Sequence, residues 1–160
     1  MQIHSIAPVY NADSRILILG SFPSVKSREV GFFYGHKQNR FWRVLSAVFE
    51  SEEPKTVEEK REFLLRFGIA LWDVIASCEI TGSSDATIRN AKPNDVEQIL
   101  KQADIRLLAV NGKTALRYYD RYLKQTLGRE AIYLPSTSPA NAAYSLAKLI
   151  EEWKVLRLPK

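Results

Sequence analysis

Short, mainly apolar runs alternate along the chain with segments whose apolar residues recur every three to four positions. The runs cover residues 16–19, 69–72, 105–110 and 131–134. A run of this kind is typical of a strand that is buried on both faces of a parallel sheet. The pattern therefore predicts an α/β protein with three layers, α/β/α, around a central four-stranded, mainly parallel sheet with right-handed crossovers.

Five segments show helical spacing of their apolar residues. They lie, in chain order, at 39–49, 56–67, 93–100, 116–127 and 138–153. Thr56 and Glu59 have the spacing of a capping box, as do Asn94 and Glu97. Ser138-Pro139 suits a helix start because serine caps well and proline fits the first turn. The segments 20–39 and 78–89 are predicted to be loops.

Polar residues or glycine follow each of the four predicted strands. The four strand ends are Gly20-Ser21, Asp73, Asn111-Gly112 and Ser136-Thr137-Ser138. The carboxyl ends of parallel strands meet at one edge of the sheet, which is where ligands bind in open α/β sheets. The sequence therefore predicts one active cleft at that edge.

The length, the net charge and the numbers of cysteines and histidines narrow the class of protein. With 160 residues the chain predicts a single domain, 1–160, and its net charge of +5 with a pI near 9.3 favours a polyanionic partner. One cysteine excludes an intramolecular disulfide, and two histidines argue against a zinc cluster. No signal peptide or run of about 18 apolar residues is evident. We expect a soluble protein of a reducing compartment, the cytoplasm, without metal or cofactor.

Two polar positions allow both a structural and a chemical interpretation. Asn39 lies where helical spacing begins, so it can cap the helix. Its carbonyl oxygen could instead hold a water molecule while its amide contacts a substrate. Ser138 can likewise cap the last helix, or the segment 136–138 and the free amides of a helix start can grip a phosphate.

Charged residues near the predicted cleft are open to the same two interpretations. The segment 20–43 places basic residues among aromatic residues that could stack on a base; they are Lys26, Arg28, Lys37, Arg40 and Arg43. Asp73 and Asp85 could act as general bases, although Asp73 also suits a buried structural role and Asp85 a turn. The basic stripe from Lys113 to Lys124 is interpreted as a solvated helix face.

Three segments resemble the uracil-DNA glycosylase superfamily. They are Gly20-Ser21-Phe22-Pro23-Ser24, residues 34–42 (Tyr-Gly-His-Lys-Gln-Asn-Arg-Phe-Trp), and Pro135-Ser136-Thr137-Ser138. The second and third are similar to the mismatch-specific uracil and thymine-DNA glycosylases. The first, with Leu71-Trp72-Asp73-Val74 and the residues that follow it, resembles the hypoxanthine (deoxyinosine) DNA glycosylase branch more closely. Together the matches extend over residues 16–144.

The resemblance implies a role for particular residues. Asn39 is implied as the catalytic group that positions the attacking water. The implied base pocket consists of Gly20, Ser21, Phe22, Pro23, Tyr34 and Asn111. The implied contacts to DNA phosphates and the minor groove are Ser24, Lys26, Ser136, Thr137, Ser138, Ala140 and Asn141. This chain departs from its relatives at Phe22, where a polar residue usually positions the water, and at 139–141, where small residues replace a strong wedge.

The resemblance therefore predicts a monofunctional DNA glycosylase of base excision repair that flips a deaminated base out of the duplex and hydrolyses its glycosidic bond. Hypoxanthine is the expected base, with uracil or mismatched thymine as further possibilities. The expected partner is DNA that contains deaminated bases, and the protein is expected to be a monomer without a membrane partner. A non-catalytic nucleic-acid binder and an enzyme that acts on free nucleosides are the two alternatives.

Overall fold

A computed structural model describes residues 1–157. Its centre is a four-stranded sheet of β2 (Ile16–Gly20), β3 (Ile69–Asp73), β6 (Leu107–Asn111) and β7 (Ile132–Leu134), in the order β3-β2-β6-β7. Every neighbouring pair in this sheet is parallel. The predicted four-stranded parallel sheet is therefore confirmed.

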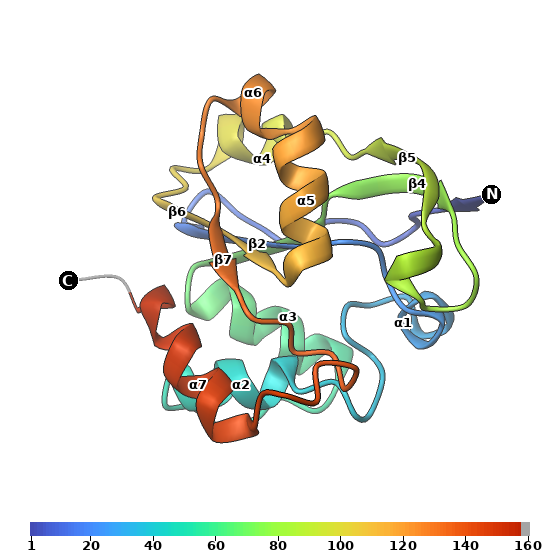
Figure 1. Cartoon of the computed structure of the whole chain (residues 1–160). Helices are drawn as coiled ribbons and strands as arrows, with labels where there is room; N and C mark the ends of the chain where they lie inside the picture. Colours follow the sequence, from blue (N-terminus) through green and yellow to red (C-terminus); the bar gives the residue numbers. More distant parts are fainter. Residues whose placement is uncertain (158–160) are drawn as a thin grey trace.

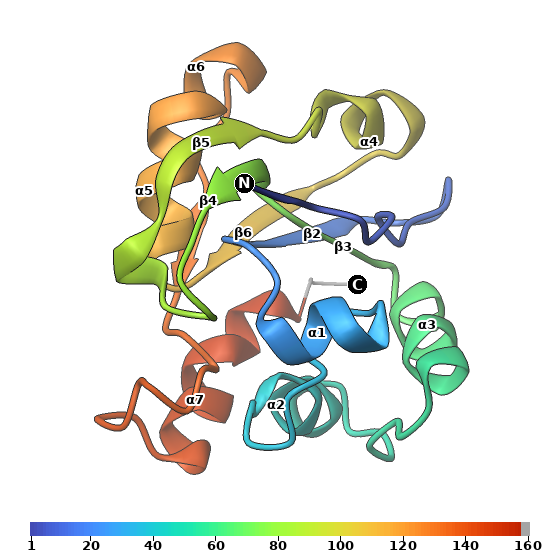
Figure 2. The same ribbon diagram turned by 90° about the vertical axis from the view of Figure 1, so that its right-hand side faces the viewer.

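Helices cover both faces of this sheet (Figures 1 and 2). One face carries α4 (Glu97–Gln102), α5 (Lys113–Tyr122) and α6 (Lys124–Leu127). The other carries α1 (Val25–Val30), α2 (Phe41–Val48), α3 (Val57–Arg66) and α7 (Leu146–Trp153). The described chain also contains two short 3₁₀ turns, η1 (Asp85–Thr87) and η2 (Lys154–Leu156). The arrangement is the predicted three-layer α/β/α sandwich.

The core is continuous from the central sheet to the helices below it. All five residues of β2 are buried, and α2 buries Phe41 and Trp42 beside them. Trp153 of α7 is fully buried, and its Nε1 donates to the carbonyl oxygen of Pro135 at 3.0 Å. An aromatic side chain buries about 150–250 Å², which contributes about 4–6 kcal/mol of transfer free energy. This packing fixes α2 and the segment after β7 relative to each other.

A second, smaller sheet was not predicted. It consists of β1 (Gln2–Ile3), β4 (Ile75–Glu79) and β5 (Arg89–Pro93), all antiparallel, in the order β1-β4-β5. The prediction of a loop over 78–89 is therefore wrong at both ends. Four of the five β5 side chains are exposed, so its sequence carries no apolar alternation, and only backbone pairing defines the strand.

Other predictions about the helices are also wrong. The segment 20–39 contains α1, because Ser24 Oγ accepts the amide of Ser27 at 3.1 Å and caps a short helix. Asn94 caps nothing with its side chain; its Nδ2 donates to the carbonyl oxygens of Asp73 and Ile75, and α4 begins at Glu97. The last helix begins at Leu146 rather than near Pro139.

The start of the last helix is displaced because a better cap lies downstream. Ser145 Oγ accepts the amide of Lys148 at 3.1 Å, which is the N-cap interaction. Ser138 Oγ instead accepts the amide of Ala140 at 3.2 Å within a turn. Residues 138–145 thus form a loop, and the predicted phosphate grip by a helix start at 138 has no helix behind it.

Candidate active site

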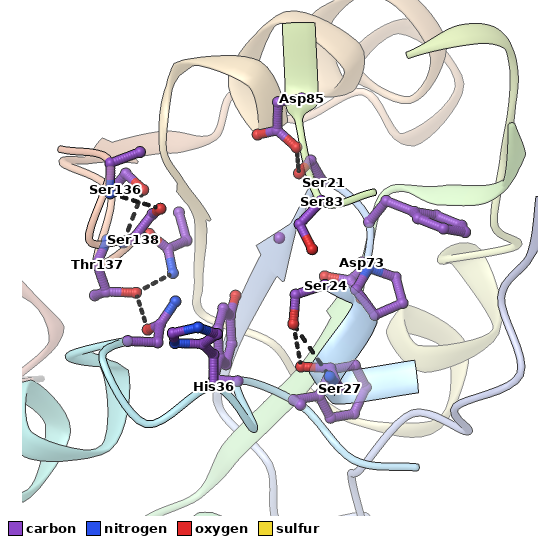
Figure 3. A pocket seen from close by; sticks show the side chains of 18 of the residues that line it. Ser21, Ser24, Ser27, His36, Asp73, Ser83, Asp85, Ser136, Thr137 and Ser138 are labelled. Atoms are coloured by element: carbon purple, nitrogen blue, oxygen red, sulfur yellow. Dashed lines mark hydrogen bonds between the residues drawn. The ribbon is translucent and has the colours of Figure 1, made fainter. Parts of the chain in front are cut away.

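A cavity of about 350 Å³ opens at the carboxyl edge of the central sheet (Figure 3). All four predicted strand ends contribute to its lining, so their predicted convergence is found in the structure. Of the site residues predicted from the sequence, the cavity is lined by Gly20, Ser21, Phe22, Pro23, Ser24, Tyr34, Asn39, Asn111, Ser136, Thr137, Ser138 and Ala140. Lys26 and Asn141 lie outside this lining.

One wall of the cavity is a chain of hydrogen bonds through Thr137. The Nδ2 group of Asn111 donates to the Thr137 hydroxyl at 3.0 Å, and that hydroxyl donates to Oδ1 of Asn39 at 2.8 Å. The amide of Thr137 donates to Oδ1 of Asn111 at 3.1 Å. Thr137 is fully buried, so its hydroxyl serves this chain, and the predicted phosphate contact by its side chain does not fit.

The orientation of the Asn39 carboxamide follows from its partners. The amide N–H of Phe41 also donates to Oδ1 at 3.0 Å, and a backbone N–H requires an acceptor, which places the oxygen rather than the nitrogen there. Asn39 therefore satisfies the amide of the first residue of α2 from the position before the N-cap, Arg40, and is not itself the predicted N-cap. Because Oδ1 already accepts two hydrogen bonds, the Nδ2 donor is the group that Asn39 offers to a ligand.

A carboxylate and a histidine lie behind Phe22 at the end of β3. His4 Nε2 contacts Asp73 Oδ2 at 2.8 Å, and both side chains are at most 5% exposed. His4 Nδ1 accepts the amide N–H of Ile6, so the ring proton lies on Nε2 and faces the carboxylate. The ring of His4 also packs edge-on to Phe22, with centroids 5.9 Å apart. Asp73 is thereby held in place with Oδ1 as its remaining acceptor.

Gly20 makes room for the floor of the cavity. A side chain at this position would collide with Asp73 Oδ1 and the hydroxyl of Tyr34, so both groups reach the strand end because the residue is glycine. The ring of Tyr34 stacks on Phe41 with centroids 4.0 Å apart. Its hydroxyl is buried and has no hydrogen-bond partner among residues 1–157. A buried, unpartnered hydroxyl in a cavity lining is a site where a ligand can supply the missing partner.

Tyr34 stays neutral in this setting. Burial raises the pKa of its hydroxyl far above the ordinary value, and the nearby Asp73 carboxylate raises it further, whereas Asn111 has the opposite effect. Tyr34 can therefore donate its proton in a hydrogen bond over the whole physiological range. It also has a positive φ of 51°, an uncommon conformation for a residue with a side chain.

Asp85 lies on the opposite side of the cavity from Thr137 and His36 (Figure 3). It belongs to η1, and its Oδ1 accepts the hydroxyl proton of Ser21 at 3.1 Å. Burial raises the pKa of the Asp85 carboxyl above its ordinary value, and Asp73 adds to the rise, while hydrogen bonds from Ser21 and Thr114 and the charge of Arg117 oppose it. The cavity thus contains two carboxylates in different surroundings.

Arg40 holds the loop that follows β7. Its Nη2 donates to the carbonyl oxygens of Ser138 at 2.9 Å and Asn141 at 3.1 Å, and its Nη1 donates to that of Tyr144. Its backbone amide donates to the carbonyl oxygen of Thr137 at 3.1 Å. The guanidinium group is thus engaged inside the protein, so the interpretation of Arg40 as a cation for DNA is wrong in this structure.

The two predicted site residues outside the lining, Lys26 and Asn141, have other surroundings. The Nδ2 group of Asn141 donates to the carbonyl oxygen of Ser136 at 3.0 Å, so this side chain ties the loop together. Lys26 is exposed on α1, and its ammonium group lies 3.9 Å from Glu29. An exposed pair at this distance is weak, so the ammonium group of Lys26 remains available at the surface.

Several lining residues were absent from the predicted site. They are Ser27, Phe33, His36, Asp73, Ser83, Asp85 and Pro139. Asp73 and Asp85 stood out in the sequence as possible bases, but nothing in the pattern placed Asp85 beside Ser21. Its position depends on β4 and β5, the two strands whose pairing the sequence did not indicate. Along residues 1–157 there is no helix long and apolar enough to cross a membrane, and no cluster of three potential metal ligands.

Comparisons with known proteins match nearly the whole chain. The family model of the uracil DNA glycosylase superfamily matches residues 7–158. A protein of Methanosarcina acetivorans named hypoxanthine DNA glycosylase is 33% identical over 150 residues, covering 92% of this chain and 93% of that protein. A protein of the same name from Methanosarcina barkeri is 32% identical over 143 residues, covering 88% and 89%.

A solved structure agrees with these matches. It is a solution NMR structure of a Methanosarcina acetivorans protein provisionally described as a uracil DNA glycosylase. The two structures superpose with a TM-score of 0.83 at 31% identity, over 98% of this chain and 96% of the other. The resemblance found in residues 20–42 and 135–138 thus extends to the whole fold. The chain belongs to the uracil DNA glycosylase superfamily.

Proposed function

We propose that this protein is a monofunctional DNA glycosylase of base excision repair that hydrolyses the N-glycosidic bond of deaminated bases, with hypoxanthine as its main substrate. The names of its relatives support this proposal. The volume of the cavity, about 350 Å³, lies within the usual range for small-molecule sites. The target nucleotide is flipped from the duplex, because its glycosidic bond is otherwise out of reach.

The proposed preference for hypoxanthine rests on one observation, the free carboxylate oxygen of Asp73 at the floor of the cavity. Asp73 Oδ2 is taken by His4, and Oδ1 lies beside Gly20 where a flipped base would end. A carboxylate only accepts hydrogen bonds. Deamination turns the N1 acceptor of adenine into the N1–H donor of hypoxanthine, and the N3 acceptor of cytosine into the N3–H donor of uracil. Asp73 therefore favours deaminated bases over their parents.

The remaining lining suits departure of the base as an anion. Phe22 offers a flat apolar surface on which the base stacks, because its side chain is held by His4 and the charge of Arg28 over the ring. The Nδ2 group of Asn39, left over by the two bonds to its Oδ1, is a donor that this wall offers to the cavity, and the unpartnered hydroxyl of Tyr34 lies buried within the lining. Oriented donors stabilise developing negative charge strongly in a site that excludes water. We assign Asn39 as the catalytic residue of this wall.

The contact surface for DNA surrounds the mouth of the cavity. Ser24, Ser136, Ser138 and Ala140 lie at its rim and Lys26 stands exposed nearby, which supports their assignment as phosphate and minor-groove contacts. The formal charge of +5 favours a polyanionic partner. Small residues at 139–141 make the loop a weak wedge, so the energy of base flipping depends more on the cavity than on intercalation.

A substrate panel tests the proposal. Duplexes carrying deoxyinosine, deoxyuridine, a G·T mismatch, deoxyadenosine or 1-methyldeoxyinosine are incubated with the protein, and free base is measured by mass spectrometry. We expect hypoxanthine to be released fastest and adenine not at all. The methyl group at N1 removes the donor that Asp73 accepts, and the loss of one hydrogen bond to a charged group, about 1.5–3 kcal/mol, predicts a rate about 10–100-fold lower.

The same panel separates the proposal from its alternatives. Binding without any base release would identify a non-catalytic lesion-binding protein. Equal activity on free deoxyinosine and on DNA would identify an enzyme of nucleosides. A rate on 1-methyldeoxyinosine equal to that on deoxyinosine would refute base recognition by Asp73.

We further propose that residues 1–160 act as one domain, as a monomer, in the cytoplasm. The single cysteine, Cys78, is buried and burial raises the pKa of its thiol, which supports a protein that needs no disulfide. Sedimentation of the purified protein with and without reductant tests this: one species near the monomer mass of 18.3 kDa is expected in both. A stable dimer would contradict it.

A further inference from the structure

The proposed reaction needs an acceptor that orients the attacking water, and the residues discussed so far do not supply one. A water that donates to an acceptor keeps its lone pair free to attack. Oδ1 of Asn39 already accepts from Phe41 and Thr137, and Phe22 has no polar atom. Oδ1 of Asn111 is engaged by the amide of Thr137. The wall that contains Asn39 thus offers donors, whereas its carbonyl oxygens are in use. These hydrogen bonds do not favour the role that the resemblance implied for Asn39, the positioning of the attacking water.

Asp85 is a carboxylate on the opposite side of the same cavity (Figure 3). Ser21 donates to its Oδ1 at 3.1 Å, which brings a residue from 64 positions further along the chain to the end of β2. A carboxylate has about four acceptor positions, so the hydrogen bonds from Ser21 and Thr114 still leave room for a water molecule. Phe22 has no carboxylate, and Asp85, which comes from another segment of the chain, therefore provides one beside the neighbouring residue Ser21.

The loop that carries Asp85 is fixed to α1. The amide of Val25 donates to Ser83 Oγ at 2.8 Å, and Arg28 Nη2 donates to the carbonyl oxygen of Gly82 at 2.7 Å. The loop is also closed on itself, because Thr87 Oγ1 accepts the amide of Thr81 at 2.9 Å. These contacts hold η1 in position before a substrate arrives, and catalytic groups act most effectively when they are preorganised.

We propose that Asp85 is a catalytic residue that orients the attacking water and accepts its proton. This inference rests on the proposed glycosylase function. Asp73, the other carboxylate of the cavity, is less suited because His4 occupies one of its oxygens and the other lies at the floor, where the ring edge of the base is read. The water must approach C1′ from the side opposite the departing base, and Asp85 lies opposite the donor wall of Asn39.

The step is balanced as a simple hydrolysis. The bond between C1′ and the base nitrogen breaks, and its electron pair leaves with the base, which Asn39 and Tyr34 stabilise as an anion. The water oxygen forms the new bond to C1′, and its proton passes to Asp85. The base anion then takes up one proton, and Asp85 loses its proton to solvent. The products are free hypoxanthine and an abasic deoxyribose with a hydroxyl group at C1′.

The surroundings of Asp85 suit this role. The titratable and charged groups around it are Asp73 of β3, Cys78 of β4, Arg117 of α5 and Tyr34. Burial and the charge of Asp73 raise the pKa of Asp85, which makes its carboxylate a better base than an exposed aspartate. The rate of base release should therefore rise with pH through this raised pKa, which lies above the ordinary 3.8, and then level off.

Single-turnover kinetics on a deoxyinosine duplex test the inference. Asp85→Asn keeps the shape of the side chain and an acceptor for Ser21, but its amide cannot accept the proton of the water. We therefore expect the release of hypoxanthine to be at least about 10²-fold slower than in the wild type. Binding to a duplex with non-cleavable 2′-fluoroarabino-inosine should stay within about threefold of the wild type, since no recognition contact is lost. The exposed Asp95→Asn, on the chain before α4, is the matched control and should behave as the wild type.

Two further measurements make the outcome independent of the folding of one variant. The acid limb of the wild-type rate should be absent in Asp85→Asn, and formate should partly restore base release by Asp85→Ala, because it supplies a small carboxylate. A wild-type rate that is flat down to the acid limit of folding, or a rate of Asp85→Asn within about threefold of the wild type, would overturn the role of Asp85. Absence of base release by the wild type would instead refute the proposed function itself.

Discussion

The hydroxyl of Thr137 donates a hydrogen bond to Oδ1 of Asn39 at 2.8 Å, although 98 residues separate the two along the chain. The same hydroxyl accepts from Asn111 at 3.0 Å. Three segments, the end of β6, the turn after β7 and the start of α2, are thereby joined in one wall of the cavity. The Oδ1 atom of the Asn39 carboxamide is held by two hydrogen bonds in the cavity lining, which leaves its Nδ2 donor for a ligand, and this orientation underlies the proposed stabilisation of the departing base.

Removing the Thr137 hydroxyl should loosen this wall. Thr137→Val keeps the shape but leaves the Nδ2 group of Asn111 buried without its partner, which should cost about 1–3 kcal/mol of unfolding free energy. We expect base release to fall about tenfold, because Asn39 loses one of the two bonds that orient it. Thr137→Ser restores the hydroxyl and serves as the control. Equal rates for the valine and serine variants would contradict the role of the hydroxyl.

Tyr34 and Tyr119 offer a matched pair of hydroxyl deletions. The Tyr34 hydroxyl is buried without a partner, so Tyr34→Phe should leave stability unchanged or raise it by up to about 1 kcal/mol, while base release falls about tenfold. The Tyr119 hydroxyl donates to the carbonyl oxygen of Arg129 at 2.7 Å, far from the cavity lining. Tyr119→Phe should therefore lose about 1 kcal/mol of stability and no activity. Thermal melts of the two variants check the predicted changes in stability, and single-turnover rates check the predicted changes in base release.

Arg40 should control the order of the loop at 138–144. Arg40→Met removes all of its contacts to the carbonyl oxygens of this loop, which should cost about 3 kcal/mol of unfolding free energy and speed amide hydrogen exchange there. Arg43→Met, at an exposed position one turn further along α2, is the comparison. If exchange in 138–144 were unchanged by Arg40→Met, the loop would be ordered by other contacts.

Asp85 should lower stability at neutral pH. Its pKa is raised in the folded state, so the folded protein binds this proton more tightly than the unfolded chain. Folding is therefore penalised most strongly above the folded-state pKa. The penalty shrinks as the pH falls below that value and is gone below the pKa of the unfolded chain. Asp85→Asn should melt at a higher temperature than the wild type at pH 7, and the difference should shrink in acid. A variant that is less stable than the wild type at neutral pH would show that the carboxylate has a structural role.

The parts of this fold that were predictable are those whose burial is expressed locally. Residues 16–19 and 69–72 are apolar at every position because both faces of β2 and β3 are covered, and this made the parallel sheet evident. The residues of β5 are mostly exposed and are held by backbone pairing with β4, so no side-chain pattern in the sequence predicted this strand. The predicted start of the last helix was wrong because Ser138 and Ser145 are both suitable caps, and only Ser145 accepts a first-turn amide of the helix.

The candidate site likewise has parts that the sequence predicts and parts that it does not. Asn39, Thr137 and Asn111 follow predictable strands or precede a predictable helix, so their meeting could be expected from the strand order of a parallel sheet. The hydrogen-bond partners that determine the chemistry of the site could not be predicted from the sequence. His4 reaches Asp73 from β1 over 69 positions, and Asp85 reaches Ser21 over 64, both through the small antiparallel sheet. Arg40, one residue after Asn39, turns inward because the loop at 138–144 offers it carbonyl oxygens.

The most direct test of the account is the rate at which Asn39→Ala releases hypoxanthine from a deoxyinosine duplex under single-turnover conditions. The wild type should release the base and leave alkali-sensitive abasic sites, and the variant should be at least about 10²-fold slower, since the oriented donor is lost. Binding of a non-cleavable duplex should persist in the variant. Equal rates for the wild type and Asn39→Ala, or no base release by either, would contradict the claim that the cavity between Asn39 and Asp85 is the catalytic site.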